Sequence, residues 1–205
     1  MNAIEALASI RIEERIAVLR DGSAVTVRAI RPGDYERETA FVRGLSSGTG
    51  YRRLLSARQP TAEDLHRFVE IDPSRELALV AVSGANSDSI QVGVVRCARI
   101  DEGPDYDFAI VVADAWQHLG LGSKLLRRLV EVAAAAGVPR LTGLTLATNG
   151  PMLTLARRCG FGLRRDPQDA TVVELTRDLR AASADSPESS PGPPAQNPVA
   201  VGRVG

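Results

Sequence analysis

Gln117, Gly120 and Gly122 are the residues whose spacing points most directly to chemistry. They follow a short apolar, β-rich run at 108–112 and precede a stretch that repeats leucine and alanine at helical spacing. Glycine lets the backbone turn tightly and leaves no Cβ between the backbone and a ligand. The first N–H groups of the following helix are unpaired and lie at its positive end. We therefore predict a cradle for a phosphate or another anion.

Two better-known glycine loops do not fit this turn. A dinucleotide-binding G-x-G-x-x-G would need a third glycine where the chain has Leu125. A phosphate loop of the G-x-x-x-x-G-K-[ST] type needs lysine directly after its last glycine, whereas Ser123 separates Gly122 from Lys124. An ordinary strand-to-helix turn also accounts for two spaced glycines, so the bare motif leaves both interpretations open.

A second motif lies in the C-terminal third of the chain. Asn149 is followed by Gly-Pro-Met, as at the start of a helix, and Gly160-Phe161 ends that helix. With Q-x-x-G-x-G, this segment resembles the GNAT superfamily of acetyltransferases, whose acetyl-CoA signature is [QR]-x-x-G-x-[GA]. Within it, the chain is most similar to the bacterial Pat-type protein lysine acetyltransferases. Further similar segments lie at 28–32, 44–46, 51–53, 71–72, 107–109, 114–117 and 149–152.

The expected order of elements, β-β-α-α-β-β-β-α-β-α-β, is also that of the GNAT fold. Two strands flank Asp21-Gly22, the favoured dipeptide of a two-residue hairpin turn, and Asp34 and Thr61 are candidate caps for the two helices that follow. Further strands are expected at 77–82, 92–100, 108–112, 141–147 and 171–175. The predicted class is α/β (α+β), with a central mixed, mostly antiparallel sheet and helices on both faces.

The 205 residues suit one catalytic domain. We expect an N-terminal extension at 1–20, in which 4–16 forms either a short amphipathic helix or a tail, and the GNAT acetyltransferase domain at 21–180. The segment 181–205 is rich in proline and serine, so we expect it to be disordered.

Composition excludes several classes of partner. Lys+Arg and Asp+Glu are equal at 25 each, so no net charge attracts nucleic acid or an anionic membrane. Cys97 and Cys159 form no metal-ligand pattern with His66 and His118, so we expect no metal and two buried or half-buried thiols. No signal peptide or membrane-spanning run occurs, and we expect a cytoplasmic protein.

The resemblance implies acetyl-CoA as the cosubstrate. Val111 and Val112 would pair with its pantetheine arm like an added strand, and Asn149 would either bond to the arm or serve only as a helix cap. Lys124, the only lysine of the chain, would add charge or simply face solvent. The expected pyrophosphate site comprises Gln117, Leu119, Gly120, Leu121, Gly122, Ser123 and Lys124.

The resemblance also implies a carboxylate base, because a lysine ammonium has a reference pKa near 10.4 and cannot attack a thioester while protonated. Related enzymes carry this base as Glu directly before Phe-Ala, and here the position is Asp107. Asp is one methylene shorter, so it would act through a water or weakly, unless it is only a solvated strand end. Asp105 and Glu102 are neighbouring substitutes, and Asp114 suits a cap or turn.

Many GNAT enzymes protonate the departing thiolate with a Tyr, and that position is Ala156 here. A thiol with a reference pKa near 8.5 is a tolerable leaving group without an acid. We expect acetyl transfer to an amine, either a protein lysine or a small molecule. A non-catalytic acyl-CoA-binding module is the alternative of another class. The sequence indicates neither the acyl-chain preference nor the oligomeric state.

Overall fold

The computed structural model describes residues 9–46, 48–49, 60–85, 88–101 and 103–180. Within them, eight strands form one sheet in the order β1-β2-β3-β4-β5-β6-β8-β7. Only β5 and β6 pair in parallel, which confirms the mixed, mostly antiparallel sheet. The strands are β1 (Arg15–Val18), β2 (Ala24–Ala29), β3 (Glu76–Ser83), β4 (Ile90–Arg99), β5 (Asp105–Val112), β6 (Arg140–Leu146), β7 (Gly162–Arg165) and β8 (Val172–Asp178).

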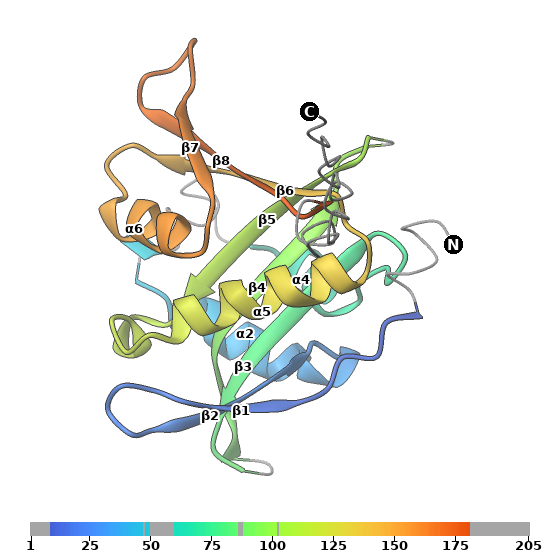
Figure 1. Cartoon of the computed structure of the whole chain (residues 1–205). Coiled ribbons are helices and arrows are strands. Elements are labelled where there is room, and N and C mark those ends of the chain that lie inside the picture. The colour runs from blue at the N-terminus through green and yellow to red at the C-terminus, as the bar shows by residue number, and fades with distance from the viewer. Residues whose placement is uncertain (1–8, 47, 50–59, 86–87, 102, 181–205) are drawn as a thin grey trace, which may run out of the picture.

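Helices cover both faces of the sheet, as predicted (Figure 1). One face carries α5 and the other carries α2 and α4, while α6 lies beside β7 at the end of the chain's path. The helices are α2 (Tyr35–Arg43), α4 (Ala62–Val69), α5 (Leu121–Ala135) and α6 (Gly150–Arg158), with short 3-10 turns η1 (Pro32–Asp34) and η3 (Asp114–Trp116).

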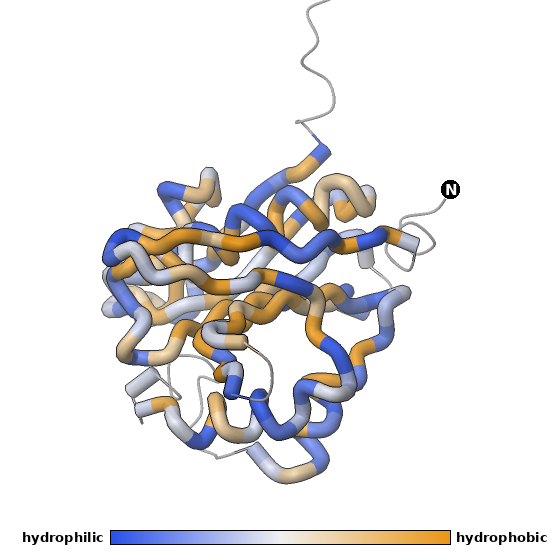
Figure 2. The backbone as a smooth tube through the Cα atoms, turned by 90° about the horizontal axis from the view of Figure 1, so that it is seen from below, coloured by the Kyte–Doolittle hydropathy of each residue, from blue (hydrophilic) through white to orange (hydrophobic). Residues whose placement is uncertain are grey.

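Two hydrophobic clusters lie on opposite sides of the sheet because side chains alternate along each strand. In β3, Leu79 packs into the cluster beneath α5, whereas Val80 packs into the cluster beneath α2 and α4. Figure 2 shows hydrophobic stretches along the strands and hydrophilic residues in many of the connecting loops. The sheet is therefore a rigid layer buried on both faces, from which the loops at its edge can present functional groups.

The predicted period of α5 is confirmed. Leu125 and Leu129 are fully buried on its inner face. The helix ends where Gly137 adopts φ +75°, and Val138 N donates to Ala133 O at 2.9 Å. This is a Schellman ending, which satisfies the last carbonyls of the helix. The predicted Thr61 cap of α4 is also present, as one half of a capping box in which Thr61 and Asp64 bond to each other's backbone N–H.

The first hairpin differs from the prediction in its turn. Leu19 N donates to Ser23 O at 2.7 Å, so three residues rather than two form the loop. Gly22 has φ +85°, the left-handed position that ends a three-residue hairpin loop. The strand before this turn begins at Arg15, and residues 10–14 form no helix. The sheet thus takes in residues that precede the boundary expected at residue 21.

The predicted element order lacks β7. This strand has four residues, lies at the edge of the sheet and is largely exposed, so neither alternation nor apolar content marks it. The expectations for 1–8, 51–53, Glu102 and the tail at 181–205 lie outside the described residues. No helix in the described part of the chain is long and apolar enough to cross a bilayer.

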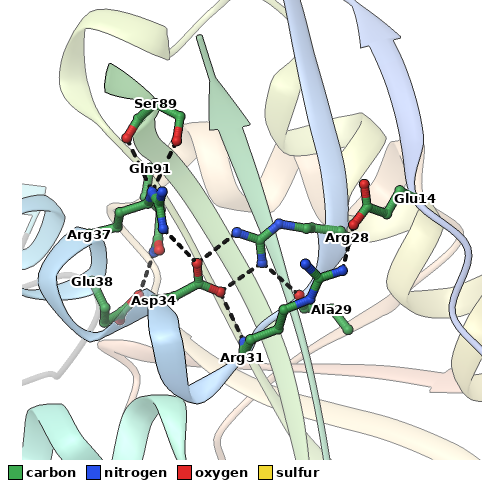
Figure 3. A network of polar contacts seen from close by, with 9 residues as sticks. All are labelled: Glu14, Arg28, Ala29, Arg31, Asp34, Arg37, Glu38, Ser89 and Gln91. Carbon is green, nitrogen blue, oxygen red and sulfur yellow. Dashed lines mark hydrogen bonds and ion pairs between the residues drawn. The ribbon is translucent and has the colours of Figure 1, made fainter. Parts of the chain in front are cut away.

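A buried ion pair joins β2 to the start of α2 (Figure 3). Asp34 accepts two hydrogen bonds from Arg28, at 2.7 and 2.6 Å, and one from Arg31 N at 2.9 Å. Burial alone would raise the pKa of Asp34, but the bonds from Arg28 and the Arg31 backbone, with the charges of Arg28 and Arg37, hold it below its ordinary value. The prediction that the Asp34 side chain caps this helix is therefore wrong, because its carboxylate bonds to the preceding turn and not to the first N–H groups of α2.

Candidate active site

A cavity of about 600 Å³ lies where β5 and β6 separate. The two strands pair only from Asp105 to Asp107 on β5 and from Arg140 to Thr142 on β6. Beyond this point they diverge, and in Figure 1 the starts of α5 and α6 flank the gap. Both strands, the turn before α5 and the first turns of α6 line the cavity.

Phe108 and Gly143 explain where the separation begins. A Cβ added to Gly143 would lie only 2.8 and 3.0 Å from ring atoms of Phe108 and 3.1 Å from its carbonyl oxygen. The ring is 5% exposed and packs on Phe161 with centroids 4.8 Å apart, so it cannot move aside cheaply. The position of the Phe108 ring therefore requires glycine at 143, the first residue of β6 after the segment that pairs with β5.

Beyond that segment, β5 presents backbone groups to the cavity that are not paired with β6. Ala113 N donates to Val92 O of β4 at 2.9 Å. Because hydrogen-bonding direction alternates along a strand, Val111 also faces β4, while Ile110 and Val112 direct their N–H and C=O groups to the opposite side. The side chain of Val111 is buried in the cluster beneath α2. Both predicted valines line the cavity, as does Ile110, which was not among the predicted residues. The alternation directs the backbone groups of Ile110 and Val112 towards the cavity.

The glycine turn adopts the backbone shape predicted for an anion cradle. His118 has φ +62° and Gly120 has φ +91°, after which α5 begins. Gly120 has no capping side chain, so the first N–H groups of α5 remain unpaired. At Gly122, an added Cβ would lie 3.4 Å from Leu155 of α6, so the two helices approach closely there.

The predicted turn residues divide into two groups. Gln117, Gly120, Gly122 and Ser123 line the cavity. Leu121 is fully buried in the core, Leu119 packs partly against it and Lys124 is exposed; none of these three side chains lines the cavity. Leu119 and Leu121 can therefore contribute only their backbone groups to an anion site at this turn.

Asp107 lies at the last position at which β5 pairs with β6, and it lines the cavity. Its carboxylate makes no hydrogen bond or ion pair with any residue that the structure describes. Desolvation by the surrounding protein raises its pKa above the ordinary aspartate value. The neighbouring candidates are engaged elsewhere: Asp105 pairs with Arg140 at 3.5 Å, and Asp114 bonds to Ser46 and Thr49.

Asp114 connects the turn to the segment that follows α2. Its carboxylate accepts bonds from Ser46 N at 3.0 Å, Ser46 Oγ at 2.8 Å and Thr49 Oγ1 at 2.7 Å. Gln117 Nε2 donates to Thr49 Oγ1 at 3.3 Å and to Val112 O at 3.1 Å. Hydrogen bonds from Ser46 N and Thr49, the two largest contributions, hold the pKa of Asp114 below its ordinary value. The side chain of Gln117 therefore fixes the end of β5.

Asn149 fulfils the predicted cap and also lines the cavity. Its Oδ1 accepts from Met152 N at 3.3 Å, and its Nδ2 donates to Thr145 Oγ1 on β6 at 3.1 Å. Ala156, further along α6, is completely buried. The helix thus contributes a polar cap at the cavity and no acid at the position where related enzymes carry Tyr.

The two cysteines are buried free thiols, as predicted. Burial, with smaller contributions from Asp107 and Glu76, raises the pKa of Cys97 to about 12. A thiol of this kind does not ionise at neutral pH and is a poor nucleophile. Among the described residues, no three His, Cys, Asp or Glu side chains gather as metal ligands would.

The profile of the Acetyltransferase (GNAT) family matches residues 27–161. The chain belongs to this family. It is 32% identical over 169 residues to acetyltransferase PA5475 of Pseudomonas aeruginosa, covering 82% of this chain and 91% of that protein. It is also 32% identical to the acetyltransferase Pat of Mycolicibacterium smegmatis over 161 residues, which are 77% of this chain and 47% of that protein.

A solved structure agrees with the assignment. The crystal structure of the GNAT domain of S. lividans PAT superimposes with a TM-score of 0.73 at 29% identity, covering 80% of this chain and 96% of that domain. The fold prediction and the family prediction are both confirmed. As a GNAT enzyme, the chain is an acetyl-CoA-dependent N-acetyltransferase.

The acetyltransferase cavity offers backbone groups of two kinds that are suited to acetyl-CoA. An open strand edge at Ile110 can pair with the amide groups of an extended pantetheine arm, as in strand addition. Unpaired N–H groups at the start of α5 suit a diphosphate. Arg20 and Thr49 are among the lining residues that were absent from the predicted site, because they come from segments far from the glycine turn in the sequence.

Proposed function

We propose that this acetyltransferase transfers an acetyl group from acetyl-CoA to lysine side chains of proteins, with Asp107 as the general base. The observation that carries the proposal is the position of Asp107. Its carboxylate, which is exposed and has no partner among the described residues, lies at the point where β5 and β6 diverge, in the cavity that also contains the glycine turn. Its raised pKa makes it a better proton acceptor than an ordinary aspartate.

The proposed reaction has two chemical steps. Asp107 takes a proton from the acceptor ammonium, directly or through one water, and the freed amine nitrogen attacks the thioester carbonyl carbon. This attack forms the C–N bond. The tetrahedral intermediate then collapses, which restores the C=O bond and breaks the C–S bond; CoA departs as thiolate, and the nitrogen loses its second proton to water, leaving the neutral amide. Since Ala156 offers no proton, the thiolate leaves without a dedicated acid, which its reference pKa near 8.5 permits.

The protein acceptor rests on similarity. The chain resembles Pat-type protein lysine acetyltransferases over several segments, and the compared proteins named Pat agree with that likeness. The bonds from Asp114 to Ser46 and Thr49 support the same proposal, because they hold the segment after α2 beside the cavity. The cytoplasmic location expected from the sequence belongs to this proposal.

The test measures thiol release from acetyl-CoA with two panels of acceptors, lysine-rich proteins and polyamines. Asp107→Asn is the catalytic variant, and Asp105→Asn is the matched control two residues away on the same strand. The enzyme contains only one lysine, Lys124, so acetyl-lysine detected by mass spectrometry is readily assigned to the acceptor.

We expect turnover on the protein panel that requires Asp107 and not Asp105. Turnover on polyamines alone would replace the protein acceptor with a small amine. Binding of acetyl-CoA without turnover on either panel would favour the non-catalytic acyl-CoA-binding module and contradict the proposal.

A further inference from the structure

The first hairpin of the chain packs directly on the glycine turn. Arg20, in the loop between β1 and β2, donates its backbone N–H to Leu119 O at 3.1 Å and its Nη1 to His118 O at 3.3 Å. Figure 1 shows this loop beside the segment that leads into α5. Residues about one hundred positions apart thus form one continuous backbone surface at the mouth of the cavity.

The guanidinium of Arg20 lies over Gly120. A Cβ added to Gly120 would lie 3.7 Å from Arg20 Nε and 3.8 Å from its Cγ. Arg20 lines the same cavity as Gly120, Gly122 and Ser123, and its side chain is exposed. A guanidinium has five donor hydrogens, and one bond to His118 O leaves the others available.

The position of Arg20 matches the part of the cavity that suits a diphosphate. The unpaired N–H groups at the start of α5 point to the same place, and two residues with positive φ shape the turn around it. Arginine binds phosphate through paired N–H groups, which gives both charge and geometry. Lys124, the cation that the sequence offers nearest to the turn, does not line the cavity.

We propose that Arg20 is a cofactor-binding residue that donates hydrogen bonds to the diphosphate of CoA and also supports the turn through His118. The hairpin therefore completes the phosphate site from outside the Q-x-x-G-x-G motif. This inference rests on the binding of CoA and not on the identity of the acceptor amine.

The test is calorimetric titration of the full chain with CoA at low and high salt. Arg20→Ala removes the side chain and keeps the backbone bond to Leu119. We expect it to weaken CoA binding about tenfold at low salt, as for a lost hydrogen bond to a charged group. Its affinity should also depend less on salt than that of the wild type, because one charge pair is gone.

Two further variants separate charge from support of the turn. Arg20→Lys keeps the charge and should recover most of the affinity, whereas Arg20→Gln keeps a donor for His118 without charge and should bind as weakly as Arg20→Ala. Arg15→Ala is the matched control, since Arg15 is an exposed arginine of the same hairpin that pairs with Glu131 and does not line the cavity. Thermal unfolding of each variant checks that it is folded.

Equal CoA affinity for wild type and Arg20→Ala would overturn this inference but not the proposed function. Arg20→Lys as weak as Arg20→Ala, with Arg20→Gln restored, would also overturn it, because the side chain would then only support the turn. Absence of CoA binding by the wild type would overturn the proposed function and this inference together.

Discussion

Asp34, in the turn before α2, and Asp107, on β5, are two aspartates with opposite surroundings. Asp34 is 2% exposed and receives bonds from Arg28, Arg37 and a backbone N–H, so its pKa is lowered (Figure 3). Asp107 lies at the wall of an open cavity, has no partner among the described residues, and has a raised pKa. The paired carboxylate stabilises the fold, and the unpaired one is available to accept a proton.

The largest expected effect is the loss of turnover in Asp107→Asn. The amide cannot accept the ammonium proton, so we expect kcat to fall by about 10²- to 10⁴-fold. Acetyl-CoA affinity should remain close to wild type, because the proposed role of the side chain is to accept the proton of the amine and not to bind the cofactor. Steady-state kinetics and calorimetry measure the two quantities.

Asp107→Glu sharpens the same comparison. The longer carboxylate restores the residue that related enzymes carry at this position, and we expect it to keep at least part of the activity. Unchanged turnover in Asp107→Asn would show that another group accepts the proton.

The second largest effect is expected on stability, in Asp34→Asn. This change leaves the guanidinium of Arg28 buried with no opposite charge, and we expect a loss of about 3 kcal/mol in the free energy of unfolding. The kcat of the folded fraction should change little, since Asp34 does not line the cavity. Urea denaturation gives the free energy, and an unchanged midpoint would contradict the structural role.

The pH dependence of the two sites should have opposite sign. The folded-state pKa of Asp34 is lowered, so its stabilisation is fully present above the ordinary aspartate pKa, near 3.9, and is lost as pH falls through the lower folded value. The folded-state pKa of Asp107 is raised, so ionisation of Asp107 opposes folding as pH rises from the ordinary value through the raised one.

Denaturation at several pH values tests this difference. The stability gap between wild type and Asp34→Asn should shrink in acid, whereas Asp107→Asn should not lose stability relative to wild type at neutral pH. The rate of acetyl transfer should fall as pH decreases through the raised pKa of Asp107. A gap for Asp34→Asn that is constant with pH would contradict the assigned ion pair.

Local sequence predicted the elements whose signals are local. Four features depend on residues within a few positions of one another: the turn before α5, the Thr61 cap, the helical period of α5 and the Asn149 cap. These predictions are confirmed because short-range chemistry determines them. Most strands were predicted correctly for the same reason.

Contacts between distant segments could not be predicted. Asp114 bonds to Ser46 across 68 positions, and Arg20 bonds to His118 across 98. Whether the backbone groups of Ile110 or those of Val111 face the cavity depends on how β5 pairs with β4. This register cannot be deduced from the sequence. The Asp34 network likewise needs the packing of α2 on the sheet before its partners meet.

The smallest expected effect concerns the exposed ion pair in Figure 3, as opposed to the buried pair of Asp34 and Arg28. Arg31 pairs with Glu14 at 2.6 Å, but both side chains are at least half exposed, so Arg31→Ala should cost less than about 1 kcal/mol by urea denaturation. The variant keeps the backbone N–H that donates to Asp34, so the buried pair remains intact. A loss as large as that of Asp34→Asn would mean that the network acts as one unit, and the contrast with Asp107 would then rest on the whole cluster and not on one buried pair.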